Sequence, residues 1–414
     1  MTEAVKDSQF LQRVVEVVGP LRRAFIQLLA EHDSPTPGPR GGKAVRQLPA
    51  AQRSRLLRAL ATEDDLSTLY HLPGMDGLRR ILSAARAARH DPELVRQCEL
   101  CVKEYEHFLA AEDVGRNQLH AVLGGFLPEA RDAVIRTNSQ TAFNAMANLI
   151  GHYAEVQVLC MILSPGLLPQ RCTLSMVRGF AGWRRLRNDS GCLFHGYGGG
   201  PQSVAAELRV TDLDGRSLDD AVGPALIEAF CSQPLPRLVL HSKYDLGSQY
   251  HLVGNEVGAE SVCTFYVGET LWNAELRFAT SDQNFCLESA IISTPCKYLL
   301  FDVLLHESIW PGAEAVAECY RVVPHGPVTE RHRDWRQFDR IDLGVKLRAH
   351  APGLPAIESI QTQRYGKLVE HALARLNLPR QELRGYRCEM PYPVYGTQVS
   401  LRFDLPPVDE STGN

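Results

Sequence analysis

The chain has 414 residues, of which 44% are hydrophobic and 22% are charged, and its formal net charge is −4. This composition is typical of a globular protein with two or three domains, and it excludes wholesale disorder and a uniformly basic coat. The N-terminus lacks a basic segment followed by an apolar one, and the longest apolar run, 156–163, is far below the roughly 20 residues that span a bilayer. We therefore expect a cytoplasmic protein without a membrane partner.

The first half of the chain is predicted to be helical. Apolar residues at helical spacing predict a helix over 10–32, which Gly19-Pro20 should interrupt or kink. The Pro- and Gly-rich segment 34–42 is expected to be a loop, and Pro49 suits the first turn of a helix over 50–61. Further helices are expected at 43–48, 66–72, 77–90, 93–111, 118–123 and 130–163.

The last of these helices carries a broad apolar stripe. Its members are Ala142, Phe143, Ala145, Met146, Leu149, Ile150, Tyr153 and Val156. A helix that is apolar over most of its circumference must be covered on more than one side. We therefore expect a homodimer interface here, with burial under the C-terminal sheet as the alternative.

Beyond Pro165 the sequence changes to short apolar runs separated by Gly, Asp and Pro, a pattern typical of antiparallel strands. Strands are expected at 204–210, 237–241, 261–267, 274–279, 289–293 and 298–305. A helix is expected at 363–376, followed by two paired strands at 383–390 and 397–405 that form a hairpin closing the sheet edge.

The predicted fold class is thus α+β, with a helical N-terminal half that contains a helix-turn-helix and a C-terminal half built on a mostly antiparallel sheet. The expected domains are a basic helical domain at 1–90, a helical connector or dimerisation region at 91–165 and an α+β domain at 166–407. The polar residues 408–414 are expected to be a disordered tail.

Basic residues are concentrated in the predicted N-terminal domain. The interval from Arg40 to Thr62 contains six basic residues and no acidic one, and 40–89 carries ten basic against four acidic side chains. A positive surface binds phosphates by releasing condensed counterions. Because 20–62 also predicts three helices, the last two joined by a short turn at Leu48-Pro49, this segment resembles the helix-turn-helix of bacterial transcription regulators.

The resemblance implies that the helix over 50–61 enters the major groove of duplex DNA, where arginine contacts phosphates or guanine edges. The nucleic-acid-binding residues are then Arg46, Arg53, Ser54, Arg55 and Arg58. The preferred function is a DNA-binding, transcription-regulator-like protein with a C-terminal sensing or assembly domain. The alternatives are a hydrolase-like enzyme in the C-terminal domain and a self-assembling scaffold protein. We expect no cofactor and no metal.

Several residues of types that bind metals or phosphates lack the partners that a known motif needs. Cys98 and Cys101 have ligand spacing but no second ligand pair nearby, so the 11 irregularly spaced cysteines are expected to be structural thiols. The glycine-rich segment 195–200, which follows Arg184, Arg185 and Arg187, lacks the Gly-Lys-Ser/Thr ending of a phosphate-binding loop. His306-Glu307 begins like a zincin motif, but Trp310 stands at the position of the second histidine.

Two possibilities stay open in the C-terminal domain. Aspartates and histidines scattered along it could assemble a general acid–base site if the fold brings them together: Asp302, His306, His241, Asp245 and His251. The aromatic and charged residues around 386–395 could form a binding surface at a turn.

Overall fold

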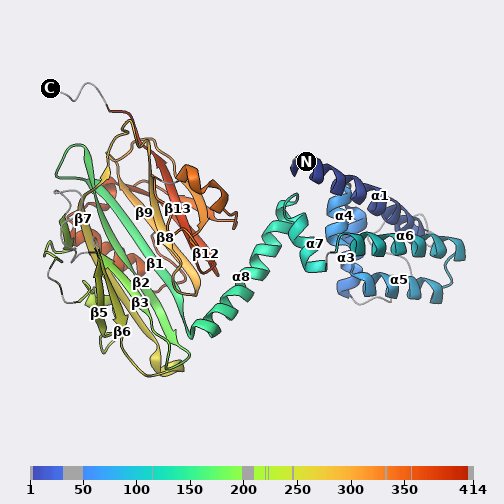
Figure 1. Cartoon of the computed structure of the whole chain (residues 1–414), viewed down its shortest axis with the longest axis horizontal. Coiled ribbons are helices and arrows are strands. Elements are labelled where there is room, and N and C mark those ends of the chain that lie inside the picture. Colours follow the sequence, from blue (N-terminus) through green and yellow to red (C-terminus); the bar gives the residue numbers. More distant parts are fainter. Residues whose placement is uncertain are drawn as a thin grey trace. The chain divides into compact units, whose positions relative to one another are not determined.

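The computed structural model describes residues 3–408 apart from 31–49, 198–208, 245–246 and the single positions 114, 220, 222, 332 and 356. The chain forms two compact units, which divide between Arg136 and Thr137. The predicted fold class is confirmed: helices precede a mostly antiparallel sheet region, which makes an α+β fold (Figure 1). In the described part of the chain every helix is too short or too polar to cross a bilayer.

The N-terminal unit is helical, as predicted. Its elements are α1 (Glu3–Ala30), α3 (Ala50–Ala61), α4 (Asp65–His71), α5 (Met75–Ala87), α6 (Pro92–Ala111), α7 (Arg116–Leu123) and the start of α8 (Pro128–Ile150). The kink expected at Gly19-Pro20 stays a prediction, whereas the alternative, an interruption, is wrong, because α1 continues through Pro20. Its apolar face is buried on both sides of the proline, at Val14, Val18, Leu21 and Phe25, and this packing outweighs the lost hydrogen bond. The predicted elements at 34–42 and 43–48 lie outside the described residues.

The predicted helix over 130–163 is wrong in its second half. Helix α8 ends at Ile150, Gly151 adopts a positive φ of 85°, and strand β1 begins at His152. A left-handed glycine after the last helical residue is a common helix end. The second half of β1, 158–163, resembles a buried helix segment because both of its faces are covered and apolar residues follow one another, whereas 152–157 alternate between buried and half-buried side chains.

This change also divides the predicted apolar stripe between a helix and a strand. Phe143 is buried, Leu149 is exposed, and Val156 belongs to the core beside β1. The region 91–165 is therefore helical only up to Ile150, and the continuous apolar helix face from which a dimer was expected is not formed. The homodimer stays a prediction.

The C-terminal unit is built on a seven-stranded sheet. In spatial order its strands are β11 (Lys346–His350), β12 (Leu383–Pro391), β9 (Cys296–His306), β1 (His152–Pro165), β2 (Arg171–Arg185), β7 (Cys263–Leu276) and β4 (Arg209–Asp212). Strands β1 and β9 are parallel, and the other neighbours are antiparallel. The predicted strands at 261–267 and 274–279 are parts of the single strand β7.

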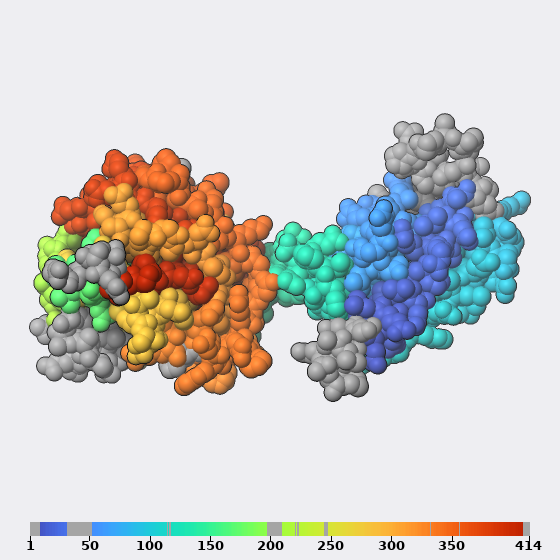
Figure 2. Space-filling view, turned by 90° about the horizontal axis from the view of Figure 1, so that it is seen from above, coloured from blue at the N-terminus to red at the C-terminus, as the bar shows by residue number. Residues whose placement is uncertain are grey.

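Two three-stranded sheets accompany the large one. The first has the order β10 (Val316–Arg321), β13 (Thr397–Asp404), β8 (Phe285–Ile291), and the second β3 (Leu193–Tyr197), β6 (Gly247–Leu252), β5 (Leu238–Tyr244). The connections contain the short 3-10 helices η1 (Glu228–Phe230), η2 (Gly258–Ser261), η3 (Arg333–Asp339) and η4 (Arg380–Glu382). The last described residues, red in Figure 2, lie at the surface of this unit.

The large sheet has a hydrophobic core on each face. One core joins it to the two smaller sheets and includes Trp183, Phe265, Phe301 and Trp310. The other lies under α9 (Tyr365–Arg375), whose apolar side packs on alternate residues of β1. The fold therefore has a layer between sheets in which any polar side chain needs an internal partner.

The predicted pairing of the last two strands is wrong. Strand β12 lies between β11 and β9 in the large sheet, whereas β13 pairs with β10 and β8 in a small one. The turn at 392–396 therefore carries the chain from one sheet to the other and closes no edge. A β-sandwich core needs such crossings, and local sequence does not distinguish them from hairpins.

Candidate functional site

Three of the five residues predicted to bind nucleic acid share an exposed face of α3. Ser54, Arg55 and Arg58 are exposed, and helical geometry places them within an arc of about 100°. Arg53 is half-buried and lies about 140° around the helix from Arg58, so it does not extend this face. Arg46 lies outside the described residues.

The charge around this face is smaller in three dimensions than the sequence window indicates. Residues 1–136 carry 19 lysines and arginines against 18 aspartates and glutamates. Two arginines of α5 are paired with acids of α6, because Arg79 lies 2.6 Å from Glu106 and Arg86 contacts Glu99. Acidic residues from later in the chain thus neutralise part of the basic segment.

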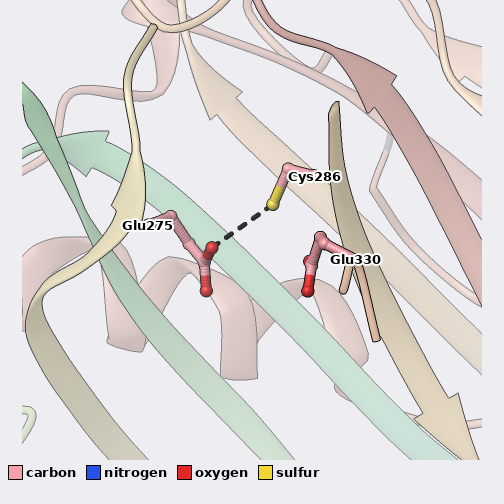
Figure 3. Close-up of side chains that lie close together, drawn as sticks. All are labelled: Glu275, Cys286 and Glu330. Carbon is pink, nitrogen blue, oxygen red and sulfur yellow. Dashed lines mark hydrogen bonds between the residues drawn. The ribbon is translucent and has the colours of Figure 1, made fainter. Parts of the chain in front are cut away.

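Three side chains that could hold a metal ion meet in the C-terminal unit (Figure 3). Glu275 stands at the end of β7, Cys286 at the start of β8 and Glu330 in the segment between β10 and η3. Their ligand atoms all lie within 4.8 Å of one another, and the Cys286 thiol donates to Glu275 at 3.4 Å. Glu330 accepts the main-chain N–H of Leu287 at 2.9 Å, which holds it beside β8.

A third acid, Glu288, adjoins this group. It lies two residues from Cys286 on β8, so strand alternation places both on one face. Its side chain is buried, and one carboxylate oxygen accepts from the Cys286 thiol at 3.6 Å. We call Glu275, Cys286, Glu288 and Glu330 the carboxylate–thiol cluster.

Three members of the carboxylate–thiol cluster, Glu275, Cys286 and Glu288, have a raised pKa. Burial and then the charge of Glu330 raise the pKa of Glu275 to about 7. Burial and then the charge of Glu275 raise the pKa of Glu288 well above its ordinary value, and the same causes raise the pKa of the Cys286 thiol. A bound cation would lower these pKa values, because it stabilises carboxylates and thiolates.

Sequence reasoning missed this cluster because β8 was expected at 289–293 and is found at 285–291. The available signal was the alternation of Cys286, Glu288 and Ala290, which places an acid at a core-facing position of a strand. Glu275 and Glu330 carried no comparable signal, since only the tertiary structure brings them to β8.

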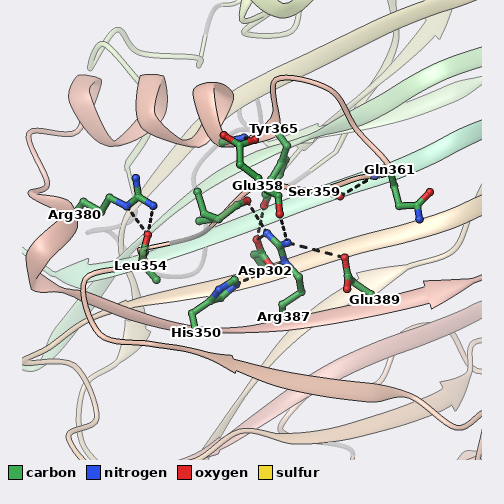
Figure 4. A network of polar contacts seen from close by, with 12 residues as sticks. Asp302, His350, Leu354, Glu358, Ser359, Gln361, Tyr365, Arg380, Arg387 and Glu389 are labelled. Atoms are coloured by element: carbon green, nitrogen blue, oxygen red, sulfur yellow. Dashed lines mark hydrogen bonds and ion pairs between the residues drawn. The ribbon is translucent and has the colours of Figure 1, made fainter.

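Asp302, one of the predicted acid–base candidates, is fully buried on β9 and pairs with Arg387 of β12 (Figure 4). Two guanidinium N–H groups reach the two carboxylate oxygens at 2.7 and 2.8 Å, and Tyr365 donates its hydroxyl at 2.7 Å. Arg387 also donates to the carbonyl oxygens of Ile357 and Glu358. The pair thus fixes α9 and the preceding segment to the sheet.

The charges of this network are balanced. Burial raises the pKa of Asp302, but hydrogen bonds from Arg387 and His350 outweigh it and hold the pKa below its ordinary value. The imidazole Nε2 of His350 lies 3.5 Å from the aspartate. An aspartate that stays ionised between a guanidinium and a tyrosine hydroxyl fits a structural role.

The other acid–base candidates are not assembled around Asp302. His306 contacts Ser308 through Nδ1 at 2.9 Å and Glu382 through Nε2 at 3.0 Å. The main-chain N–H of Ser308 also donates to Nδ1, so hydroxyl and amide share one acceptor and close the turn after β9. His241 and His251 lie in the small sheet, on β5 and β6, and Asp245 lies outside the described residues.

The remaining candidates are the arginines and glycines of 184–200, the cysteines and the residues around 386–395. Arg185 is buried and donates to carbonyl oxygens of Leu252, Gly254 and Ser190, so it is occupied within the fold. The glycines at 198–200 lie outside the described residues. All 11 cysteines are free thiols, and burial raises the pKa of Cys98 to about 12. Tyr386, Arg387 and Cys388 belong to β12 rather than to a turn.

Comparison with known proteins adds no functional information. No protein-family model matches the sequence, and no curated protein gives a significant match.

Proposed function

We propose that the protein binds the phosphate backbone of duplex DNA through the outer face of α3. The observation that carries this proposal is that Ser54, Arg55 and Arg58 are exposed on one face of a helix that contains no acidic residue. Arginine and serine side chains are common phosphate donors in protein–DNA interfaces.

A hollow beside this face supports the proposal. Arg55 lines it together with Gln52 and the residues Pro73–Gly77, which include the acidic Asp76, and its volume is about 590 Å³. The segment contains the start of α5, whose N-cap residue, Gly74, offers no side-chain acceptor to the first turn. Main-chain N–H groups at a helix start favour an anion, so a phosphate near Arg55 would gain a second set of donors.

The small number of cations predicts weak, non-specific binding with a shallow salt dependence. Each phosphate contact contributes a slope of about −0.9 to the plot of log affinity against log salt, so two arginines give about −2. If all ten basic residues of 40–89 contacted phosphates, the slope would be far steeper. Arg79 and Arg86 are paired with acids of α6, so not all ten are free to do so.

The test is fluorescence anisotropy of a labelled duplex with the full-length protein at several salt concentrations. We expect binding at low salt with a slope near −2, and loss of binding in Arg55→Glu/Arg58→Glu. The matched control is Arg80→Glu, an exposed arginine of α5, which should bind almost as the wild type does. Absence of binding at low salt, or equal binding by the double variant, would contradict the proposal.

A further inference from the structure

Against the expectation from the sequence of structural thiols and no metal, we propose that the carboxylate–thiol cluster binds a divalent cation of the zinc type, with Glu275, Cys286, Glu288 and Glu330 as ligands. The cluster joins the end of β7 to β8 and to the segment that follows β10. Because these elements belong to different sheets, an ion at this place would cross-link the two sheets of the sandwich.

The observation that supports this proposal is that Glu288, unlike the other buried acids that the structure describes, has no arginine beside it. Five acidic residues are buried among those that the structure describes: Glu269, Glu288, Asp302, Glu318 and Asp339. Four of them lie against an arginine, namely Arg178, Arg387, Arg333 and Arg336.

Glu288 is 3% exposed, and within the described part of the chain its one hydrogen-bond donor is the Cys286 thiol. One of its carboxylate oxygens lies 3.6 Å from the Cys286 sulfur, and the charges of Glu275 and Glu330 act on it as well. A buried carboxylate needs a counter-charge or a proton, and none of the lysines, arginines and histidines that the structure describes lies within ion-pair distance of Glu288.

The distances between the ligand atoms are close to those of an occupied zinc site. Ligand atoms in a tetrahedral zinc site, at 2.0–2.3 Å from the ion, are roughly 3.3–3.8 Å apart. The ligand atoms of Glu275, Cys286 and Glu330 already lie within 4.8 Å of one another. Both Glu275 and Glu330 are half-buried, so rotation of their side chains can supply the remaining shift of about 1 Å.

The mixture of ligands selects the metal. Magnesium and calcium prefer oxygen ligands alone, whereas zinc accepts thiolate together with carboxylate. On binding, the S–H bond of Cys286 is replaced by a sulfur–metal bond, and its proton passes to water together with any proton held by the ligating carboxyl groups, without oxidation or reduction. Four protein ligands leave no open position, which is typical of structural zinc rather than catalytic zinc.

The experiment uses the full-length protein, stripped with a chelator and then titrated with Zn²⁺ or Co²⁺. We expect one equivalent of metal per chain, a higher thermal midpoint, and a thiolate-to-cobalt charge-transfer absorption. In Cys286→Ser this absorption should be lost. The matched control is Cys319→Ser, a buried thiol of β10 outside the cluster, which should keep both the absorption and the stoichiometry.

A second variant keeps the test decisive if Cys286→Ser does not fold. Glu330→Gln retains the acceptor for the Leu287 N–H and removes one charge from a half-buried side chain. We expect it to weaken Zn²⁺ binding by roughly tenfold or more. The proposal is overturned if the wild type binds no stoichiometric metal, if the cobalt absorption persists without Cys286, or if Glu330→Gln binds Zn²⁺ as tightly as the wild type.

Discussion

Two groups of buried carboxylates in the C-terminal unit differ in the partners that surround them. Asp302 lies against the guanidinium of Arg387 and also receives the hydroxyl of Tyr365. Glu288 lies near two other carboxylates and a thiol. The comparison shows that the interior of the sandwich accepts an ionised acid where the chain supplies the matching cation. Where it does not, the acid must take a proton or an external cation.

The two groups also differ in what they connect. The Asp302 network joins β9 and β12, neighbours in one sheet, to α9 on its outer face. The carboxylate–thiol cluster joins residues of two different sheets across the inner layer. The first group is complete without a ligand, whereas the second becomes complete when an ion is bound. Three measurements test this contrast.

The largest effect is expected for Arg387→Met, which leaves Asp302 buried without its cation. Removing one partner of a buried ion pair costs about 3–5 kcal/mol in unfolding free energy. Urea denaturation followed by tryptophan fluorescence reports this unit, because Trp183, Trp272, Trp310 and Trp335 all belong to residues 137–414.

The control is Arg375→Met, which breaks the half-exposed ion pair with Asp214 and should cost less than about 1 kcal/mol. The double variant Asp302→Leu/Arg387→Met should recover part of the loss, since it removes both charges. Equal stability of Arg387→Met and the wild type would show that the network does not hold the sheet and helix together.

His152 is a buried titratable side chain without an acidic partner among the described residues, so its protonation reports the effect of burial on stability. It is buried at the start of β1, and burial together with the charge of Arg185 lowers its pKa to about 4. Between pH 6.5 and pH 4 the unfolded chain therefore binds a proton that the folded chain does not, and stability falls as the pH falls. The loss attributable to His152 is about 3 kcal/mol by pH 4.

The measurement is unfolding free energy against pH for the wild type and His152→Phe. The variant should show a flatter slope between pH 6.5 and pH 4, whereas His241→Phe, at an exposed position, should keep the slope of the wild type. Parallel curves for the wild type and His152→Phe would refute this account.

The smallest effect is expected for Glu288→Gln in protein kept free of metal by a chelator. Replacing an acid that has no cation partner by a neutral amide should raise the unfolding free energy by about 1 kcal/mol. Glu318→Gln is the matched comparison, because Glu318 is also buried but accepts two hydrogen bonds from Arg333 at 2.6 and 3.1 Å. The Glu318→Gln variant should be less stable than the wild type. Loss of stability in both variants would contradict the difference between acids with and without an arginine partner.

Sequence reasoning was most successful where structure depends on local patterns. The helices at 50–61, 66–72, 93–111 and 363–376 were expected within a few residues of α3, α4, α6 and α9. Helical spacing also identified the exposed face of Ser54, Arg55 and Arg58, because the direction of a side chain follows from its place in the turn. Local patterns were least informative at β1, whose second half, 158–163, is buried on both faces and so lacks the alternation of an ordinary strand.

The amino-acid sequence alone therefore determined the class of the fold, the position of most helices and the exposed side of α3, because each depends on residues a few positions apart. Only the tertiary structure decided which charges are neutralised and which acids meet. Arg79 and Arg86 are paired by α6, and Glu275 and Glu330 reach Cys286 from other parts of the chain. These contacts depend on how strands order themselves in the sheets, and strand order is set by burial over the whole unit rather than by any local pattern.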